Sequence, residues 1–598
     1  MSPRLKAFNS TTLGTLIPRG QRKNWVIVIV MGIVVAGAEA IAAMTVAALI
    51  AAMSEASVGA FQLPIVGSVA DIVPGDTAGD RLRFLAIVTA AFFILKSGLL
   101  LAKTYVQARV AHMTGANMAN RLFEGYLAMP YSFHINNNSS ELMRNASWAA
   151  DEVVATFLTP VATILAQSAM LILLLGVLIA TAPIVTLVTI GVLVPLVLVI
   201  ARLVRPRLHH LGTVTKESVT NALNSLQQSL HGIRDVKVLG RERYFGREFR
   251  ATRWEMARAR YQSATLSQVP SVAVETLVIV TIIVFVAINS TGGIDQSTLP
   301  TLALFAYAGM RMMPAVSKMV AGVNSLRYGQ SVAETLAGSL RNIASEASRP
   351  PPGDVRPPEF AKELVLEDVL FAYDSDSETL KSINLEIKRG ESIGIVGETG
   401  AGKTTLLDVI LGLLTPNSGS VRVDSEEIRD VLRGWHRIIG LVPQTIYLLD
   451  DTIRRNIAYG LSDDEIDDEA VEDAVELAQL SEFLATLPHG IETVVGERGV
   501  RLSGGQRQRV AIARALYRKP KVLIFDEGTA SLDNLTEAEL LRAIERLRDE
   551  HTILTVAHRL STVKNCDRVI LLEKGEIRDE GTYEELRERN VTFRRMTG

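Results

Sequence analysis

Apolar residues form long runs in the first half of the chain and short runs in the second half. A helix that crosses a membrane needs about 20 mostly apolar residues. Runs of roughly this length or longer occur at Trp25 to Met53, Phe84 to Ala102, Ala155 to Ala180, Val185 to Ala201, Pro270 to Asn289 and Leu299 to Val323. The pattern predicts six membrane-spanning helices, with a tight turn at residues 181–183 between the third and the fourth.

Positive charge follows the second and fourth predicted spans, where Arg and Lys recur through long polar connections. The connection after the first span instead carries the acids Glu55, Asp71, Asp76 and Asp80. Lys and Arg concentrate on the cytoplasmic side of membranes. The asymmetry therefore predicts that both termini are cytoplasmic and that the two long connections extend into the cytoplasm.

Helix breakers interrupt these two connections at residues 129–134 and 231–235. Each is either a simple turn or a short crosswise helix that presses on another domain. On the opposite side of the membrane, residues 61–73 place Ile65, Val66, Val69, Ile72 and Val73 on one helical face. This outer segment is either a short helix in the membrane interface or a loop packed on the ends of the spans.

Proline and glycine accumulate at residues 346–360, which marks a linker between a membrane domain (1–345) and a second domain (361–598). In the second domain, runs of strand length alternate with helical segments. These runs are Leu364 to Leu366, Ser392 to Val396, Arg437 to Val442, Val522 to Phe525, Thr552 to Val556 and Arg568 to Leu572. The expected fold is an α-helical membrane domain followed by an α/β domain with a mainly parallel sheet.

Composition agrees with this segregation, because 48% of the residues are hydrophobic while 21% are charged. The formal net charge of -2 gives no indication of a nucleic-acid partner. Cys566 is the single cysteine, which excludes an intramolecular disulfide and a four-cysteine metal site.

A phosphate-binding motif follows the predicted strand at Ser392 to Val396 and precedes a predicted helix that begins at Thr405. It reads Gly397-Glu398-Thr399-Gly400-Ala401-Gly402-Lys403-Thr404, which matches the P-loop pattern. Its glycines allow backbone N–H groups to converge on phosphates, and the helix N-terminus adds partial positive charge. We expect Lys403 to reach the β- and γ-phosphates of ATP and the Thr404 hydroxyl to bind Mg²⁺.

A second motif ends the predicted strand at residues 522–525 with two carboxylates, Asp526 and Glu527. Asp526 is suited to bind Mg²⁺ as a Walker-B residue, and Glu527 is suited to activate water as a general base. A strand of this kind is what a P-loop fold requires.

Between these motifs lies Leu502-Ser503-Gly504-Gly505-Gln506, which resembles the signature of the ATP-binding cassette (ABC) transporter family. The resemblance implies that Ser503, Gly504, Gly505 and Gln506 contact the γ-phosphate bound by a second copy of the domain. It further implies roles for Tyr373 (adenine stacking), Gln444 (sensing of γ-phosphate and Mg²⁺), His558 (switch histidine) and Asp533 (D-loop acid). The family commonly has Ala-Thr-Ser-Ala-Leu-Asp where this chain has Gly528-Thr529-Ala530-Ser531-Leu532-Asp533. The acid is kept, so hydrolysis is still expected, but the small residues that shape the dimer contact of this loop are permuted.

Six spans fused to one ATP domain resemble the exporter half-transporters of this family. Each ATP site needs the P-loop of one copy and the signature of another, so the resemblance implies a dimer that works by alternating access. Both motifs are intact, which favours a homodimer over a heterodimer. The implied location is the bacterial inner membrane.

Among exporters, the chain looks most like flippases of lipid-linked oligosaccharides, on residues 310–314 and 445–448 and on the outer segment. Ser271 departs from this likeness, because a basic residue is expected there. The leading hypothesis is flipping of an anionic polyprenyl-linked glycan. The alternatives are export of drugs, ordinary lipids or peptides, and a membrane-tethered regulatory ATPase.

Charged residues occur inside the predicted spans at Glu39, Lys96, Glu275 and Arg311. A charge at the bilayer centre costs ~2.5–3.5 kcal/mol on the insertion scale, so such residues usually face an internal cavity. One interpretation is that ion pairs, Glu39 with Lys96 or Glu275 with Arg311, lock the helices together. The other is that Lys96 and Arg311 line the pathway and bind a phosphate or pyrophosphate headgroup.

Overall fold

The computed structural model describes residues 10–53, 62–63, 67–68, 77–290, 299–347, 356–373, 378–496, 499–526, 550–557 and 560–596. Contacts divide the chain into two compact units. The helical unit comprises residues 1–129 and 137–348, and the α/β unit comprises residues 130–136 and 349–598.

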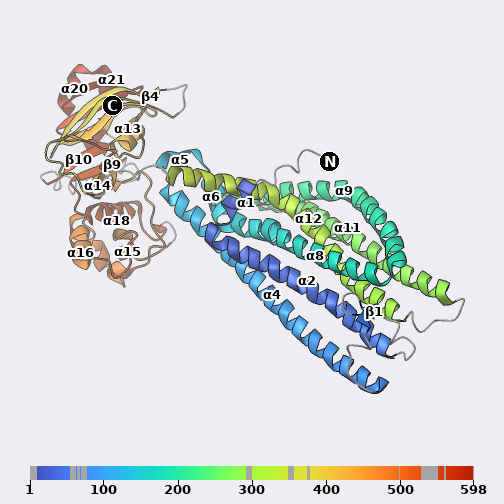
Figure 1. The fold of residues 1–598 in the computed structure, drawn as a ribbon. Coiled ribbons are helices and arrows are strands. Elements are labelled where there is room, and N and C mark those ends of the chain that lie inside the picture. The colour runs from blue at the N-terminus through green and yellow to red at the C-terminus, as the bar shows by residue number, and fades with distance from the viewer. Residues whose placement is uncertain are drawn as a thin grey trace. The chain divides into compact units, whose positions relative to one another are not determined.

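Long helices build the helical unit (Figure 1). Its helices are α1 (Ser10–Leu16), α2 (Arg19–Met53), α4 (Ala78–Ala128), α6 (Ser139–Arg144), α7 (Ala150–Val153), α8 (Thr159–Thr181), α9 (Pro183–His231), α10 (Ile233–Val238), α11 (Glu242–Ser290) and α12 (Leu299–Ala347), with π-helical turns at η2 (Asn145–Ala149) and η3 (Val154–Leu158). Each predicted span falls on one of the long helices. Within the described residues, the stretches Arg19–Met53, Gly79–Ala128 and Glu141–Thr181 are long and apolar enough to cross a membrane.

Small residues form the interior of the helical unit. The alanines that α2 buries against Leu174 of α8 and Tyr307 of α12 are Ala42, Ala43, Ala47, Ala48, Ala51 and Ala52. Large apolar residues point outward instead, such as Ile27 on α2 and Ile94 on α4. Small side chains let helices approach closely, whereas outward apolar side chains suit contact with lipid.

The structure tests the predictions for the turn at residues 181–183, for the two interrupted connections and for part of the outer segment. The turn between α8 and α9 lies at Ala182, as predicted. Both interrupted connections contain a short helix, α10 and α5 (Tyr131–Asn136), and contacts assign α5 to the α/β unit. In the outer segment, β1 (Gln62–Leu63) pairs antiparallel with β2 (Gly67–Ser68), so a helix is wrong for these four residues. The remaining residues of 61–73 lie outside the described part.

The α/β unit contains two larger sheets and several short helices. Its strands are β3 (Glu363–Ala372), β4 (Glu378–Lys388), β5 (Ser392–Val396), β6 (Ser418–Val423), β7 (Glu426–Glu427), β8 (Ile439–Val442), β9 (Val522–Asp526), β10 (Thr552–Val556), β11 (Arg568–Glu573) and β12 (Glu576–Gly581). Its further helices are α13 (Lys403–Ile410), α14 (Leu432–Arg437), α15 (Ile453–Ile457), α16 (Asp468–Leu477), α17 (Ser481–Ala485), η5 (Gly490–Glu492), α18 (Gly504–Leu516), η7 (Leu560–Val563), α20 (Tyr583–Arg589) and α21 (Val591–Met596).

The main sheet has the strand order β12-β11-β5-β10-β9-β8. Pairing is parallel from β11 to β8, and β12 pairs antiparallel with β11 at one edge. All five residues of β5 and all five of β10 are buried, as expected for central parallel strands covered on both faces. The predicted mainly parallel sheet is confirmed.

A second, antiparallel sheet of order β4-β3-β6-β7 was not predicted. Alternate residues of β4 are buried, so its apolar side chains never form a continuous run. Leu385 and Ile387 of β4 share one hydrophobic core with Ile395 of β5 and Ile524 of β9. This core joins the second sheet to the first.

Candidate functional site

The predicted ATP-binding residues follow neighbouring parallel strands at one edge of the main sheet. The P-loop follows β5, Ala557 follows β10, Asp526 ends β9, and Gln444 comes two residues after β8. Val556 lies opposite Asp526 in the pairing of β10 with β9. Because these strands are parallel, their carboxyl ends meet at the same edge, which is where ligands bind in open α/β sheets.

Glycine conformations shape the P-loop. Gly400 and Gly402 have positive φ angles of 84° and 100°, which side chains with a β-carbon rarely adopt. A β-carbon on Gly397 would collide with the carbonyl oxygen of Leu572 on β11. The loop can therefore turn tightly under the first residues of α13 and keep its backbone accessible to phosphate.

Lys403 is buried at the start of α13 and donates hydrogen bonds to two carbonyl oxygens of the loop. Its Nζ lies 2.8 Å from Gly397 O and 3.2 Å from Glu398 O. The ammonium group is thus held inside the loop, beside the N-terminus of α13. A helix N-terminus with a lysine is a general arrangement for binding phosphate.

Tyr373 comes directly after β3 and is 46% exposed. Its hydroxyl lies 3.3 Å from Thr405 Oγ1 on α13, and its ring packs edge-on against Phe371, with centroids 5.0 Å apart. These contacts hold the ring next to the P-loop helix and leave part of it accessible. An aromatic ring in this position can stack on a base.

Carboxylates cluster beside the P-loop. Asp526 ends β9, and its charge acts on Asp408 of α13. Burial raises the pKa of Asp408 to about 6, and repulsion from Asp526 adds to the effect. The Asp526 carboxylate and the Thr404 hydroxyl are oxygen donors of the kind that Mg²⁺ prefers, so the chemistry of this donor set fits the ion.

The signature residues begin helix α18. Ser503 is its N-cap: Gln506 N donates to Ser503 Oγ at 3.3 Å, and Ser503 N donates to Gln506 Oε1 at 2.8 Å. This reciprocal capping box fixes the first turn of the helix. Since Ser503 Oγ is an acceptor here, its own hydrogen remains able to donate to an anion in front of the helix.

Arg514 connects α18 to the segment that follows Gln444. Its Nε donates to Asn456 O at 2.8 Å and its Nη1 donates to Tyr447 O at 2.9 Å. Buried residues on α15, α16 and α18 form a hydrophobic cluster with Val442 and Leu448. The signature helix and the segment after β8 therefore pack as one body.

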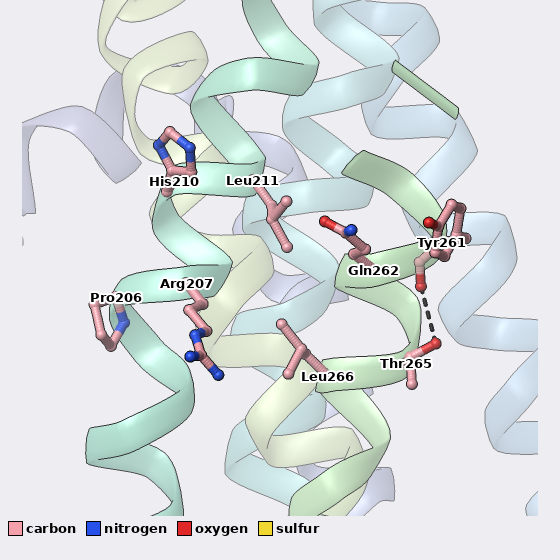
Figure 2. A pocket seen from close by; sticks show the side chains of 8 residues that line it. All are labelled: Pro206, Arg207, His210, Leu211, Tyr261, Gln262, Thr265 and Leu266. Carbon is pink, nitrogen blue, oxygen red and sulfur yellow. Dashed lines mark hydrogen bonds between the residues drawn. The ribbon is translucent and has the colours of Figure 1, made fainter. Parts of the chain in front are cut away.

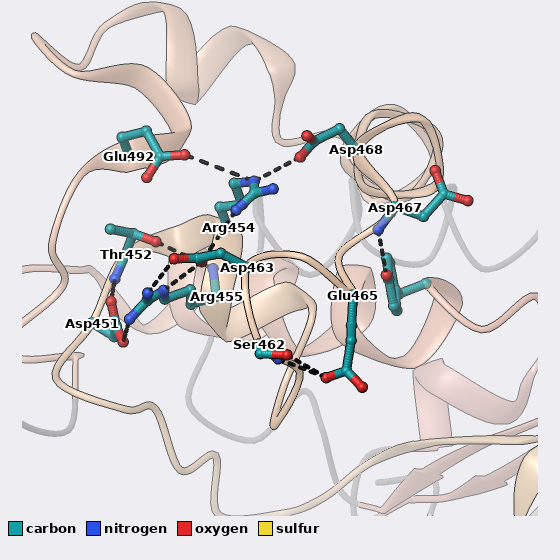
Figure 3. Close-up of polar contacts among 11 residues, drawn as sticks. Asp451, Thr452, Arg454, Arg455, Ser462, Asp463, Glu465, Asp467, Asp468 and Glu492 are labelled. Carbon is teal, nitrogen blue, oxygen red and sulfur yellow. Dashed lines mark hydrogen bonds and ion pairs between the residues drawn. The ribbon is translucent and has the colours of Figure 1, made fainter.

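An ion-pair network extends this body on its surface (Figure 3). Arg454 Nε lies 2.6 Å from Asp468 Oδ1 at the start of α16, and Arg455 Nη2 lies 2.5 Å from Asp463 Oδ2. The hydrogen bond with Arg455 lowers the pKa of Asp463. Exposed pairs contribute little stability individually, but here they connect α15 both to the following loop and to α16.

Three predicted site residues, Glu527, Asp533 and His558, lie outside the described residues. The other residues of the ATP site are in the α/β unit at the positions given above.

Three of the four charged residues predicted inside the spans form a cluster around Glu39. Lys96 Nζ and Arg311 Nε each lie 3.1 Å from Glu39 Oε2, and Tyr307 donates its hydroxyl to the same oxygen at 3.1 Å. The side chains of Lys96 and Glu39 are 3% and 5% exposed, whereas that of Arg311 is 38% exposed. The predicted Glu39–Lys96 pair is present, and Arg311 pairs with Glu39 rather than with Glu275.

Among the residues that the structure describes, the helical unit contains cavities of ligand size at two places. One, of about 690 Å³, lies between α9 and α11 and has Arg207, His210 and Tyr261 beside apolar side chains such as Leu211 and Leu266 (Figure 2). The other, of about 650 Å³, lies between α4, α8 and α12. Neither is lined by Lys96 or Arg311.

The second cavity contains two lysines that the sequence analysis missed, Lys103 and Lys318. Lys103 follows the last residue of the predicted second span, so it resembled an ordinary basic flank. Lys318 lies inside the predicted sixth span and was not singled out. The available signal was their spacing, since each lies seven residues after Lys96 or Arg311.

A P-loop, a Walker-B strand and a signature helix on one α/β unit, fused to long apolar helices, define an ATP-driven membrane transporter. Family models agree with both parts. The ABC transporter transmembrane region matches residues 26–313, and the ABC transporter model matches residues 380–530. The chain belongs to the ABC transporter family, and it is an exporter in which the membrane and ATP-binding domains are fused and ATPase activity is coupled to transport.

Curated relatives cover most of the chain. The ATP-dependent lipid A-core flippase of Alkalilimnicola ehrlichii is 32% identical over 499 residues, covering 82% of each chain. The protein of the same name from Ralstonia nicotianae is 31% identical over 525 residues, covering 87% of each chain. Among solved structures, a bacterial Atm1-family ABC exporter with ATP bound matches with a TM-score of 0.74 and 23% identity over 97% of each chain, which supports the fold.

Proposed function

We propose that two copies of this chain form an ATP-driven flippase for a phosphorylated glycolipid. Candidate substrates are a polyprenyl-(pyro)phosphate-linked oligosaccharide and a lipid of the lipid A-core type. The observation that carries the proposal is the cluster around Glu39, where one carboxylate is shared by two cations. The names of the curated relatives support a glycolipid over drugs or peptides.

The homodimer follows from the composition of an ATP site. The P-loop and Tyr373 bind ATP in one copy, and Ser503, Gly504, Gly505 and Gln506 of the other copy donate to its γ-phosphate. Both halves are present in this chain, so two identical copies make two complete sites. The free hydrogen of Ser503 Oγ and the N-terminus of α18 suit this role.

Hydrolysis is assigned to residues at the carboxyl edge of the main sheet. Thr404, Gln444 and Asp526 would hold Mg²⁺, which neutralises charge on the β- and γ-phosphates when bound. Lys403 orients the phosphates, Glu527 accepts the proton of the attacking water, and His558 contacts the γ-phosphate. Asp533 contacts the partner copy.

In the helical unit, Arg311 is assigned to bind the lipid phosphate and Lys96 to support it. With all three groups ionised, Glu39, Lys96 and Arg311 carry one net positive charge. Lys96 is buried against Glu39 and stays there. Arg311 is partly exposed, so it can exchange its contact with Glu39 for a phosphate while Lys96 keeps the carboxylate neutralised.

The membrane arrangement completes the proposal. Residues 1–345 form the membrane domain, 346–360 the linker and 361–598 the ATP domain. The protein spans the bacterial inner membrane, with both termini and the ATP domain on the cytoplasmic side. This orientation follows from the basic connections, because Lys and Arg concentrate on the cytoplasmic side of membranes.

Transport in proteoliposomes tests the substrate. Wild-type protein should flip a polyprenyl-pyrophosphate-linked oligosaccharide or lipid A-core faster than an uncharged glycolipid. Both Arg311→Gln and Lys96→Gln should lose this preference, because each removes the net positive charge of the cluster. Arg341→Gln, an exposed change elsewhere on α12, is the control. If the wild type moves uncharged amphipaths equally well, the proposal is wrong and a general amphipath exporter replaces it.

A further inference from the structure

Basic residues occur at two levels along α4 and α12. Lys103 follows Lys96 by seven residues, and Lys318 follows Arg311 by seven. Seven residues are about two helical turns, or roughly 10 Å, and return to the same face. Lys96 of α4 and Arg311 of α12 both contact Glu39, and these two cations define the first level. Lys103 of α4 and Lys318 of α12 line one cavity, and they define the second level. Both helices therefore run in the same direction from the first level to the second. The second level lies nearer the ends of α4 and α12 from which the chain continues toward the α/β unit.

The two levels differ in how their charge is balanced. At the first level, the Glu39 carboxylate forms ion pairs with both Lys96 and Arg311. At the second level, neither Lys103 nor Lys318 forms an ion pair with any residue that the structure describes. Both ammonium groups line the same cavity, so their like charges repel each other. Two like charges that face one cavity are unfavourable until an anion enters between them.

Polar side chains of α4 and α8 complete this cavity. Gln107 lies on α4, and Gln167 and Thr163 lie on α8. Asp151 also lines the cavity, and its carboxylate packs directly against Gly115 of α4. The contact is so close that a β-carbon added to Gly115 would lie 2.5 Å from Asp151 Oδ1. Gly115 is twelve residues beyond Lys103, or about 18 Å along α4. The cavity thus has two lysines toward one end, amide and hydroxyl groups, and Asp151 with His112 toward the other end.

This distribution matches a ligand with a phosphate at one end and hydroxyl groups along its length. The lysines suit the phosphate, while the amides and Asp151 can accept hydrogen bonds from sugar hydroxyls. A volume of about 650 Å³ is within the ~300–1,000 Å³ typical of ligand sites. The cavity between α9 and α11 fits less well, because it has one permanently charged cation, Arg207, where the second cavity has two lysines.

We infer that Lys103 and Lys318 form a second anion-binding site, which receives the phosphorylated headgroup of the glycolipid before Arg311 binds it. The inference rests on the proposed function and adds a residue pair and an order of events. The headgroup would bind between α4, α8 and α12 at the second level and then pass two helical turns along α4 and α12 to Arg311. The Glu39 cluster keeps Arg311 in place until that transfer.

Binding of lipid A-core to the full-length protein in phosphatidylcholine nanodiscs tests the inference. Lys103→Gln/Lys318→Gln should weaken binding at least about tenfold, because two charge-assisted contacts are lost. Lys103→Arg/Lys318→Arg should retain most of the affinity. Arg109→Gln/Arg341→Gln removes two exposed charges from the same helices outside the cavity and should bind like the wild type. Thermal unfolding of each variant verifies that it is folded.

Further measurements distinguish failure of the second anion-binding site from failure of the proposed function. Wild-type affinity in the folded Lys103→Gln/Lys318→Gln variant would overturn the second site, provided that the wild type prefers lipid A-core to its dephosphorylated form. If the wild type shows no such preference, the proposed function fails as well. Soluble glucose 1-phosphate should compete weakly; if it competes as well as the lipid, the site binds free phosphosugars and the glycolipid assignment is wrong.

Discussion

Lys96 and Glu39 are 57 positions apart in the chain, yet Lys96 Nζ lies 3.1 Å from Glu39 Oε2 in the interior of the helical unit. The ammonium group also lies 4.4 Å from the centroid of the Phe93 ring. The pair connects α2 to α4, and Tyr307 adds α12 through its hydroxyl. The same carboxylate thus fixes three helices and positions Arg311.

The first prediction follows from this burial. Removing one partner of a buried pair leaves an uncompensated charge and typically costs about 3–5 kcal/mol. Glu39→Gln should therefore lower the melting temperature markedly, because Lys96 stays buried without its carboxylate. Glu39→Gln/Lys96→Met removes both charges and should recover most of the loss. Thermal unfolding in detergent measures both variants, and an additive loss in the double variant would contradict the pairing.

A second prediction concerns hydrolysis. Glu527→Gln keeps the size of the side chain and removes the base, so turnover should fall by ~10²–10⁴-fold. ATP binding and closure of the dimer should persist. Phosphate release and equilibrium binding of ATP measure the two effects separately. Turnover at the wild-type rate would exclude Glu527 as the base.

A third prediction concerns the composite sites. Ser503→Ala would also remove the N-cap of α18, at a typical cost of about 1 kcal/mol. Ser503→Asp keeps a capping oxygen and places negative charge against the γ-phosphate, so it isolates the contact with ATP. Homodimers of Ser503→Asp and of Lys403→Ala should both be inactive. Mixed dimers contain one intact site and should recover activity.

The measurement is ATP hydrolysis across mixing ratios of the two chains. Activity should be highest near equal amounts, where mixed dimers are most abundant. If P-loop and signature act within one chain, no ratio restores activity.

Motifs with local geometry were predictable from the sequence. The limits of β5 and β10 match the predicted runs, because fully buried strands leave continuous apolar sequence. The antiparallel sheet was missed because β4 alternates apolar with polar residues, so it contains no continuous apolar run. For the outer segment the apolar spacing leaves a helix and a loop open. The described residues Gln62–Leu63 and Gly67–Ser68 pair as strands, while the five apolar residues of the predicted helical face lie outside the described part.

Long-range partners were predictable only in part. The sequence predicts Glu39–Lys96 as one of two possible ion pairs, but it gives no indication that Arg311 also contacts Glu39. Which helices face each other depends on packing between segments far apart in sequence, and the charges alone allow several pairings. The same limit applies to Lys103 and Lys318, whose shared cavity becomes visible only when α4 and α12 are placed side by side.

The last prediction concerns Asp424, which holds the start of β3. Its carboxylate accepts hydrogen bonds from the backbone N–H groups of Ala361, Lys362 and Glu363 at 2.8, 2.8 and 3.0 Å. Burial by itself would raise the pKa of Asp424, but these donors outweigh it and hold the pKa below its ordinary value. A lowered pKa means that the charged form stabilises the fold. That stability is present above the ordinary carboxyl pKa of about 4 and is lost as the pH falls through the lower, folded-state value.

Asp424→Asn should therefore weaken this contact at pH 7, and the difference from the wild type should shrink as the pH falls below about 4. Asn tolerates the left-handed backbone at this position, where φ is 53°, so the variant tests the charge and not the turn. Hydrogen exchange of the amides at residues 361–363, corrected for the intrinsic effect of pH, measures the contact directly. Glu426→Gln, an exposed change on β7, is the matched control and should leave these amides protected. Equal protection in Asp424→Asn and the wild type at pH 7 would show that the carboxylate charge does not stabilise the start of β3.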